Sequence, residues 1–205
     1  DAVMSSSVPS AYVSYAPESV PGADSVLVTN IKNDVSVGAQ MVDGGLDPIP
    51  VPAAVGDSLV LEIFSASALL MRDLVTVPDA DPPKVVRTSP RRGKTRVPLN
   101  SQIGVVFSEP VSPATVNAGT ILLLNGTETV PVTVGLDEDG LIVELTPGDP
   151  LQAGVTYVVL VTKGVTDRAG DQLAAEYLSE FTTEFESGAG ALTVRTVTTN
   201  NLDPD

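Results

Sequence analysis

The sequence contains no cysteine, no histidine and no tryptophan. Without cysteine, the chain has no disulfide framework, no thiolate nucleophile and no cysteine-ligated zinc or iron–sulfur site. Without histidine, it cannot carry a Ser-His-Asp triad or a histidine-ligated haem or zinc within its own residues. Aromatic residues make up only 4% of the chain, which leaves few side chains for stacking on sugars or bases. These absences exclude many common catalytic and cofactor sites.

Sequence motifs of several large enzyme classes are also missing. The chain contains no G-x-S-x-G nucleophile elbow, no P-loop and no dinucleotide fingerprint. Its paired carboxylates, such as Asp79 with Asp81, lie in predicted linkers and strand ends, where nothing desolvates them as a general acid requires. No apolar run approaches the ~18–20 residues of a membrane-spanning helix. We therefore expect no enzyme, no resident cofactor and no transmembrane segment in this chain.

Acidic and basic residues are unevenly distributed. The chain has 26 acidic and 11 basic residues and a net charge of −15. More than half of the cations fall within residues 84–96, a segment without any acid, which we call the basic segment. They are Lys84, Arg87, Arg91, Arg92, Lys94 and Arg96. The segment carries +6 and leaves −21 for the rest of the chain. Such overall acidity disfavours a nucleic-acid partner, because phosphate binding needs a broad cationic surface.

Proline, glycine and β-branched residues dominate what is present. With 17 prolines, 17 glycines and abundant valine and threonine, the chain predicts short strands joined by tight turns, and therefore an all-β fold. Residues 1–25 are rich in serine and proline and predict an extended arm with one short strand near residues 11–15. Residues 26–77 predict a small Ig-like β domain, in which DGGLDPIPVP forms turns between strands. This domain either completes a sandwich alone or borrows a strand at an exposed sheet edge.

A proline-rich stretch, VPDADPPK, predicts a boundary between two domains. Pro78, Pro82 and Pro83 cannot donate hydrogen bonds to a sheet, so residues 78–83 are expected to form a stiff linker. The boundary lies directly before the basic segment. The six cations therefore belong to the start of the second domain.

The remaining residues predict a second domain and the start of a further strand or domain. Over residues 84–186, seven β-rich runs recur at roughly 8–12-residue spacing, which is typical of an Ig-like sandwich. Two of these runs, TILLL and VPVTV, flank Asn125-Gly126 and predict a hairpin. Residues 187–205 comprise a Gly-rich joint and the alternating run ALTVRTVTT, which we expect to begin a further strand or domain.

Four motifs in the second domain carry a family resemblance. They are NSQIGVVFSEPV at residues 100–111, PGDPLQAGVTY at 147–157, VTDRAGDQL at 165–173 and FTT at 181–183. In order and spacing they resemble the bacterial Ig-like domain of S-layer and other cell-surface proteins, over about half of the chain. Residues 26–77 look only generically Ig-like. The resemblance implies modules for spacing, adhesion or assembly, without catalytic residues.

Residues within these motifs also have structural roles that an Ig-like sandwich predicts. Phe107 and the alternating valines around it are expected to point inward. Tyr157 occupies a position where such sandwiches use a tyrosine to hydrogen-bond a neighbouring turn. Asp167 and Gly170 fit a tight turn, in which the aspartate binds its own backbone and the glycine adopts positive φ.

Our hypothesis from the sequence is a non-enzymatic structural or interaction module of an exported bacterial envelope protein, at the periplasm or the cell surface. The alternative is an accessory subunit on the periplasmic face of a respiratory, photosynthetic or secretory membrane complex. In that alternative, the N-terminal arm and the basic segment would be the contact elements. The sequence starts at Asp1 without methionine, so we expect either that a targeting segment was removed or that the chain is a fragment.

The family resemblance accounts for the turn at residues 90–93 but not for the charges around it. Three partners stay open for the basic segment. The first is the acidic surface of the neighbouring domain, since residues 1–83 carry 11 acidic and two basic residues. The second is an acidic partner protein, and the third is anionic lipid headgroups. All six cations are therefore candidate docking residues.

Two acidic turns are weak candidates for calcium binding. The DEDG turn at residues 137–140 and the pair Asp167 and Asp171 lack the D-x-D-x-D-G loop and its distal glutamate, so solvated turns account for them better. Calcium held between two tandem domains is left open. The sequence Asn125-Gly126-Thr127 is a formal glycosylation acceptor, but a hairpin turn is the better interpretation.

Overall fold

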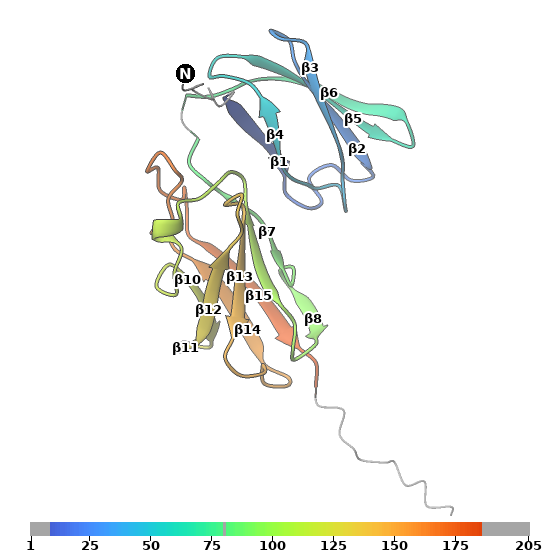
Figure 1. The fold of residues 1–205 in the computed structure, drawn as a ribbon. Helices are drawn as coiled ribbons and strands as arrows, with labels where there is room; N and C mark the ends of the chain where they lie inside the picture. The colour runs from blue at the N-terminus through green and yellow to red at the C-terminus, as the bar shows by residue number, and fades with distance from the viewer. Residues whose placement is uncertain (1–8, 80, 186–205) are drawn as a thin grey trace, which may run out of the picture.

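The computed structural model describes residues 9–79 and 81–185. Within them, fifteen β-strands and one short 3-10 helix (Pro113–Thr115) build two β-sandwich domains in tandem. Figure 1 shows the first domain in blue to cyan and the second in green to red, one beyond the other along the molecule. The predicted all-β fold of tandem Ig-like sandwiches is confirmed. No helix in the described part of the chain has the length and apolar character needed to cross a membrane.

The first domain packs a four-stranded sheet against a two-stranded one. The larger sheet has the strand order β3-β2-β5-β6, and the smaller pairs β1 with β4, with antiparallel neighbours throughout. Alternate residues face inward, so Val28, Ile63 and Val51 are fully buried between the two sheets. The strands are β1 (Ser10–Tyr15), β2 (Ser25–Asn30), β3 (Val35–Gln40), β4 (Leu46–Pro52), β5 (Ser58–Ser65) and β6 (Ala68–Thr76).

The N-terminal segment differs from its prediction as an arm. Strand β1 pairs with β4 and belongs to the first domain, where its alternate side chains Ala11, Val13 and Tyr15 pack on the core. The predicted short strand is thus present, but it is one half of a sheet of the domain. Its composition conceals this, because serine and proline surround the three apolar positions. Residues 1–8 lie outside the described residues.

The DGGLDPIPVP stretch also differs from its prediction, because most of it forms strand β4 instead of turns. Pro50 and Pro52 lie opposite Tyr12 and Ser10 and place the missing N–H on the side away from β1, and Pro48 lies where the register of the two strands shifts. The carbonyl of Pro52 on that side accepts hydrogen bonds from the side-chain amides of Asn30 and Asn33, at 3.0 and 3.2 Å. The strand therefore tolerates three prolines because it is an edge strand.

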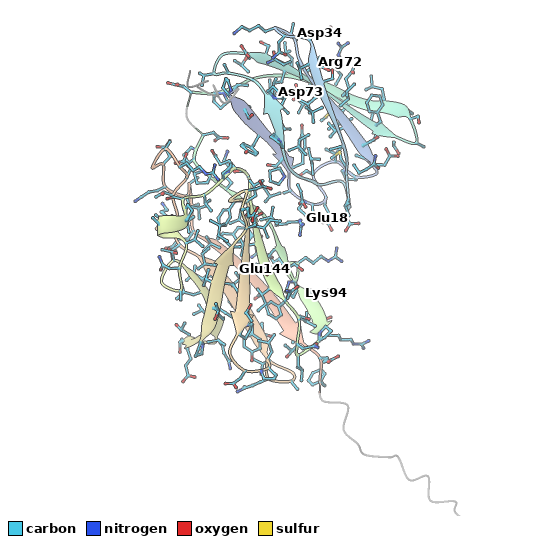
Figure 2. The ribbon with its side chains drawn as sticks, in the orientation of Figure 1. Glu18, Asp34, Arg72, Asp73, Lys94 and Glu144 are labelled. Atoms are coloured by element: carbon cyan, nitrogen blue, oxygen red, sulfur yellow. The ribbon has the colours of Figure 1, made fainter. Side chains whose placement is uncertain are left out.

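Gly44 allows the loop after β1 to lie against the start of β4. The N–H of Glu18 donates to the carbonyl of Asp43 at 2.8 Å, and the N–H of Val20 to that of Gly44 at 3.0 Å. A Cβ at Gly44 would overlap the Val20 carbonyl, and its φ of +67° also favours glycine. This close approach fixes Glu18 and the nearby Asp47 at the end of the first domain that faces the second (Figure 2 labels Glu18).

The second domain is a sandwich of a five-stranded and a four-stranded sheet. Their strand orders are β11-β10-β14-β15-β8 and β12-β13-β9-β7. Phe107 and Phe181 are the largest fully buried side chains, and Phe107 points inward as predicted. The strands are β7 (Val85–Ser89), β8 (Lys94–Val97), β9 (Ile103–Phe107), β10 (Ile121–Asn125), β11 (Glu128–Val130), β12 (Val132–Leu136), β13 (Ile142–Pro147), β14 (Thr156–Val161) and β15 (Tyr177–Thr183).

The chain forms nine strands here, where the sequence predicted seven. The hairpin at Asn125-Gly126 exists, with Asn125 opposite Glu128, but it joins β10 to the three-residue β11. After Pro131, β12 pairs with β13 in the other sheet. Proline cannot donate to the ladder, so the run VPVTV divides between the two sheets at this residue. The other additional strand, β8, lies inside the basic segment.

Three predicted roles of the motif residues are confirmed. The hydroxyl of Tyr157 accepts a hydrogen bond from the N–H of Gln152 at 2.8 Å. Its ring stacks on Phe181, with 5.8 Å between the centroids. Oδ1 of Asp167 accepts hydrogen bonds from the N–H groups of residues 169, 170 and 171, and Gly170 has a φ of +101°. These contacts fix turns at the two ends of the second sandwich.

Candidate docking surface at the domain junction

The basic segment forms one lateral edge of the second domain. It runs from the linker into β7, turns at residues 90–93 and continues into β8. Strand β7 is the edge strand of one sheet and β8 that of the other, where β8 runs parallel to β15 (Figure 1). The turn depends on Gly93, which has a φ of +75° and donates its N–H to the carbonyl of Glu180 at 2.7 Å. Arg87, Lys94 and Arg96 therefore lie on strands, Arg91 and Arg92 lie in the short turn between them, and Lys84 directly precedes β7.

Arg87 of β7 reaches across the junction to the first domain. Its Nε and one terminal nitrogen bind the two carboxylate oxygens of Asp47 at 2.6 and 2.7 Å, a bidentate ion pair. These hydrogen bonds to Asp47 raise the pKa of the guanidinium. The next residue, Thr88, points into the sandwich, and its hydroxyl lies 2.7 Å from that of Ser179 on β15. This buried contact fixes the strand from which Arg87 extends.

Two more of the six cations have acidic neighbours within the chain. Arg91 lies 4.0 Å from Glu18 of the first domain, a long and exposed contact. Lys84 binds Asp81 of the linker at 2.7 Å. The sequence did not single out Asp47 or Glu18, since neither belongs to a motif and both meet the basic segment only after folding. The only sequence feature that pointed to acidic partners of the basic segment was the net negative charge of residues 1–83.

The remaining three cations, Arg92, Lys94 and Arg96, have no ion pair or hydrogen bond among the described residues, and we call them the basic edge. All three are exposed. In Figure 2 Lys94 points away from the protein on the outer side of β8. Arg96 has a φ of +55°, a conformation that non-glycine residues rarely adopt. The structure thus separates the predicted docking residues into three that have acidic neighbours and three that face solvent.

Two open clefts lie between the domains. One, of about 690 Å³, is lined by Tyr15, Val42 and Tyr177, together with Arg91 and Arg92. The other, of about 880 Å³, lies beside β1 and is lined by acidic side chains of the linker and of the second domain. These acidic residues are Asp79, Asp81, Glu109, Asp167 and Asp171. The first cleft also has Glu18, Asp43 and Asp47 in its lining, so its charges are balanced, whereas the second cleft is acidic.

Glu109 is the most perturbed titratable group at the acidic cleft. Burial is the main cause that raises its pKa to about 7, and the charges of Asp167 and Asp81 add to it. The nearby cation of Lys84 acts in the opposite direction. A carboxyl group with this pKa changes charge near neutral pH, so the electrostatics of the junction vary with pH.

The two acidic turns use their carboxylates on their own backbone. Oδ1 of Asp137 accepts the N–H groups of Leu141 and Ile142 at 2.8 and 3.0 Å, and Asp167 binds three N–H groups as described above. Over residues 9–79 and 81–185, no group of three or more acidic side chains is arranged to hold a metal ion. We therefore locate the candidate site in the basic edge.

The folds of both domains and the exposed basic edge define a tandem β-sandwich protein whose candidate site is a surface for docking. A family model described as the bacterial Ig-like domain matches residues 79–183, about half of the chain. The chain belongs to this bacterial Ig-like family. None of the curated proteins compared with the chain matches it.

Solved structures with a similar fold come from several proteins. The N-terminal part of the bacterial S-layer protein SbsC is 26% identical, with a TM-score of 0.40, over 50% of this chain and 23% of that one. CopC from Methylosinus trichosporium OB3b is 22% identical, with a TM-score of 0.42, over 51% of this chain and 95% of that one. The BSP domain of a biofilm-associated protein is 14% identical, with a TM-score of 0.39, over 82% of this chain and 26% of that one. The chain therefore spans less than a quarter of the S-layer structure that it matches.

Proposed function

We propose that the chain is a non-enzymatic structural module of an exported bacterial envelope protein. In this function the two Ig-like domains form a spacer with a set angle, and the basic edge docks on an acidic protein surface. The observation that carries the proposal is the division of the basic segment. Arg87 is held in a bidentate contact with the first domain, whereas Arg92, Lys94 and Arg96 remain exposed without a partner among the described residues.

The chemistry of the basic edge supports a modest, salt-sensitive contact. Three like charges within five residues repel one another, and an acidic partner surface would relieve this repulsion. Each exposed ion pair contributes at most about 1 kcal/mol, so three pairs give weak docking and mainly set orientation and association rate. We therefore expect the contact to weaken as the ionic strength rises.

An acidic protein surface fits the basic edge better than an anionic membrane does. The rest of the chain carries a large negative charge. An anionic membrane that attracted the three cations would also repel this negative charge. A protein surface can match a small cationic strip and leave the acidic flanks in solvent. The alternative of an accessory subunit on a membrane complex uses the same basic edge, but the predicted N-terminal contact element is reduced, since residues 10–15 form part of a sheet.

The docking proposal can be tested with two matched triple variants. One replaces Arg92, Lys94 and Arg96 with alanine. The control replaces Arg72, Lys163 and Arg168 with alanine and so removes the same charge elsewhere. Poly-L-glutamate and phosphatidylglycerol vesicles serve as the acidic polypeptide and the lipid probe. We expect the basic-edge variant to lose about tenfold or more of its affinity for poly-L-glutamate, as roughly 1 kcal/mol per lost pair predicts, while the control changes little.

Two outcomes would contradict this assignment. Equal losses in both variants would mean that only net charge matters, and stronger binding to vesicles than to the polypeptide would assign the basic edge to lipid.

Localisation is tested separately in the native bacterium by cell fractionation and by the protease sensitivity of intact cells. Recovery of the protein only in the cytoplasm would exclude an envelope role. Comigration with a detergent-extracted membrane complex would favour the accessory subunit.

A further inference from the structure

Strand β6 forms an open edge of the larger sheet in the first domain. It pairs with β5 on one side, and no strand of the described residues pairs with it on the other. With nine residues it is the longest strand that the structure describes. Its side chains Leu69, Leu70 and Leu74 are 53%, 49% and 62% exposed. A long edge strand with exposed apolar side chains is a template for pairing with another extended segment.

The hydrogen bonds next to β6 show which of its backbone groups face this open edge. The N–H of Val77 donates to the carbonyl of Asp57 at 2.9 Å, on the side of β5. Backbone direction alternates along an antiparallel strand, so the odd-numbered residues of β6 turn toward β5. The N–H and C=O groups of Arg72, Leu74 and Thr76 therefore point outward, where a further strand would bind them.

The side chain of Asp73 occupies part of this edge. Its Oδ1 accepts a hydrogen bond from the N–H of Leu74 at 2.8 Å, which is one of the outward groups. Asp73 is exposed and has no ion pair among the described residues (Figure 2 labels it). A neutral strand that covered this carboxylate would leave a desolvated charge without a partner, which is costly. A strand with a cation opposite Asp73 would pair with the carboxylate and release the N–H of Leu74.

We propose that residues 191–199, ALTVRTVTT, of a second copy of the chain add to β6 as an antiparallel strand with Arg195 opposite Asp73. The segment is rich in valine and threonine, which favour strands, and it has the same length as β6. Between residues 187 and 202 the chain contains no acid, and Arg195 is its single basic residue. The segment therefore has the one cation that the edge of β6 requires.

This register also brings apolar side chains together on both faces of the sheet. Residues directly opposite each other in an antiparallel pair share a face. With the charged pair aligned, Val197 falls opposite the half-buried Met71 on the inner face, and Val194 falls opposite the exposed Leu74 on the outer face. A shift by one residue would move the arginine to the outer face, and a shift by two would leave the carboxylate unpaired.

The length of chain before the segment assigns it to another copy. Strand β15 begins at Tyr177, which lines the junction. Phe185 lies against Gly154 at the far end of the second domain (Figure 1). The eight residues from one to the other cover roughly 26 Å of extended chain, whereas residues 186–191 reach at most about 22 Å. The segment therefore cannot return to β6 of its own first domain, and a second copy must supply it.

This contact is head-to-tail and goes beyond the proposed function. The segment of one copy occupies the first domain of the next, so both partners keep an unused surface and the contact repeats into an open chain. It does not involve Arg92, Lys94 or Arg96. The two proposals can therefore fail independently.

Charge reversal on each side of the pair tests the contact in the full chain. Asp73→Arg and Arg195→Asp each place like charges opposite one another, so we expect each to lower the association constant from sedimentation velocity by at least about tenfold. A chain with both substitutions restores the pair with reversed signs and should associate like the parent. The control is Asp149→Arg, which makes the same change of charge at an exposed position of the second domain.

Disulfide trapping tests the register, because the chain has no natural cysteine. Leu74→Cys is mixed under a mild oxidant with Leu192→Cys, Val194→Cys or Thr196→Cys. We expect at least about tenfold more heterodimer with Val194→Cys than with the other two, since a disulfide needs Cα atoms within ~7 Å. Ser36→Cys, at an exposed position on the opposite edge strand β3, is the control and should give little heterodimer with any of them.

Four outcomes would overturn the proposal. The first is a parent chain whose association does not depend on concentration, and the second is a doubly reversed chain that does not regain association. The third is an equal loss in Asp149→Arg, which would reduce the effect to net charge. The fourth is an intrachain disulfide in a Leu74→Cys/Ser5→Cys variant in place of the heterodimer, which would assign the edge of β6 to residues 1–8. The basic-edge triple variant is expected to associate like the parent.

Discussion

The guanidinium of Arg87 and the carboxylate of Asp47 form two hydrogen bonds, of 2.6 and 2.7 Å, across the junction between the two sandwiches. The two residues are 40 positions apart and lie on strands of different domains. A single contact of this kind defines both a distance and an orientation, because both groups are planar. It therefore contributes more to the angle between the domains than its modest energy suggests.

We expect Arg87→Ala and Asp47→Ala to broaden the distribution of interdomain angles without unfolding either domain. The side chains are 35% and 54% exposed, so a double-mutant cycle should give a coupling energy of at most about 1 kcal/mol. Small-angle scattering measures the domain arrangement, and chemical denaturation gives the coupling energy. The control is the Glu62–Arg72 pair within the first domain. If removal of that pair changed the scattering equally, the contact at Arg87 would have no special role.

Gly44→Ala is expected to destabilise the first domain strongly. Its new Cβ would overlap the Val20 carbonyl, and the positive φ adds backbone strain, so we expect a loss of about 2–4 kcal/mol. Gly22→Ala is the matched control, because its φ is +82° but no atom lies within 4 Å of the added Cβ. That variant should lose only about 1 kcal/mol. Urea denaturation compares the two, and similar losses would show that strain alone accounts for Gly44.

Tyr157→Phe should destabilise the second domain by about 1 kcal/mol, because the N–H of Gln152 would lose its acceptor. Tyr177→Phe removes a hydroxyl that has no hydrogen bond among the described residues, and it should leave the free energy of unfolding nearly unchanged. Thermal unfolding of both variants tests the difference. Equal effects would mean that the tyrosine hydroxyl contributes no net stability at residue 157.

Glu109 predicts an unusual dependence of stability on pH. Its pKa in the folded protein, about 7, lies above its ordinary value of 4.5, so between these values the folded chain binds more protons than the unfolded chain. The stability contributed by this group is therefore complete below pH 4.5 and is lost as the pH rises through 7. Since the group is only half-buried, we expect a change of about 1 kcal/mol or less after solvent screening.

Glu109→Gln should thus be more stable than the parent at pH 8, with the difference shrinking toward pH 5. Urea denaturation at several pH values measures this change. Glu144→Gln, at an exposed position on β13, is the control and should follow the parent across the range. A parent protein whose stability rose between pH 5 and 8 relative to Glu109→Gln would contradict the raised pKa.

Local patterns in the sequence predicted the parts of the fold that depend on neighbouring residues. The inward position of Phe107, the turn at Asp167 and the hydrogen bond of Tyr157 all follow from motifs of a few residues in fixed order. Strand β4 was missed because three prolines normally exclude a strand, and only its place at a sheet edge allows them. Strand β8 was missed because its charges conceal the single buried residue, Val97.

The candidate site was only partly predictable for a related reason. The concentration of cations in residues 84–96 is visible in the sequence, but which of them have partners depends on how two domains meet. Asp47 and Arg87 become neighbours through tertiary structure alone, and the exposed state of Lys94 follows from the pairing of β8 with β15. The acidic cleft combines residues from β1, the linker and the second domain, so no local pattern could reveal it.

The alternating prolines of β4 leave the outer edge of the two-stranded sheet poor in hydrogen-bond donors. Along its outer border, Pro50 and Pro52 offer no N–H, and the carbonyl of Pro52 already accepts hydrogen bonds from two side-chain amides. That border therefore offers few groups with which a further strand could pair. The residues that usually interrupt a strand thus protect this exposed sheet edge from unwanted pairing with other chains.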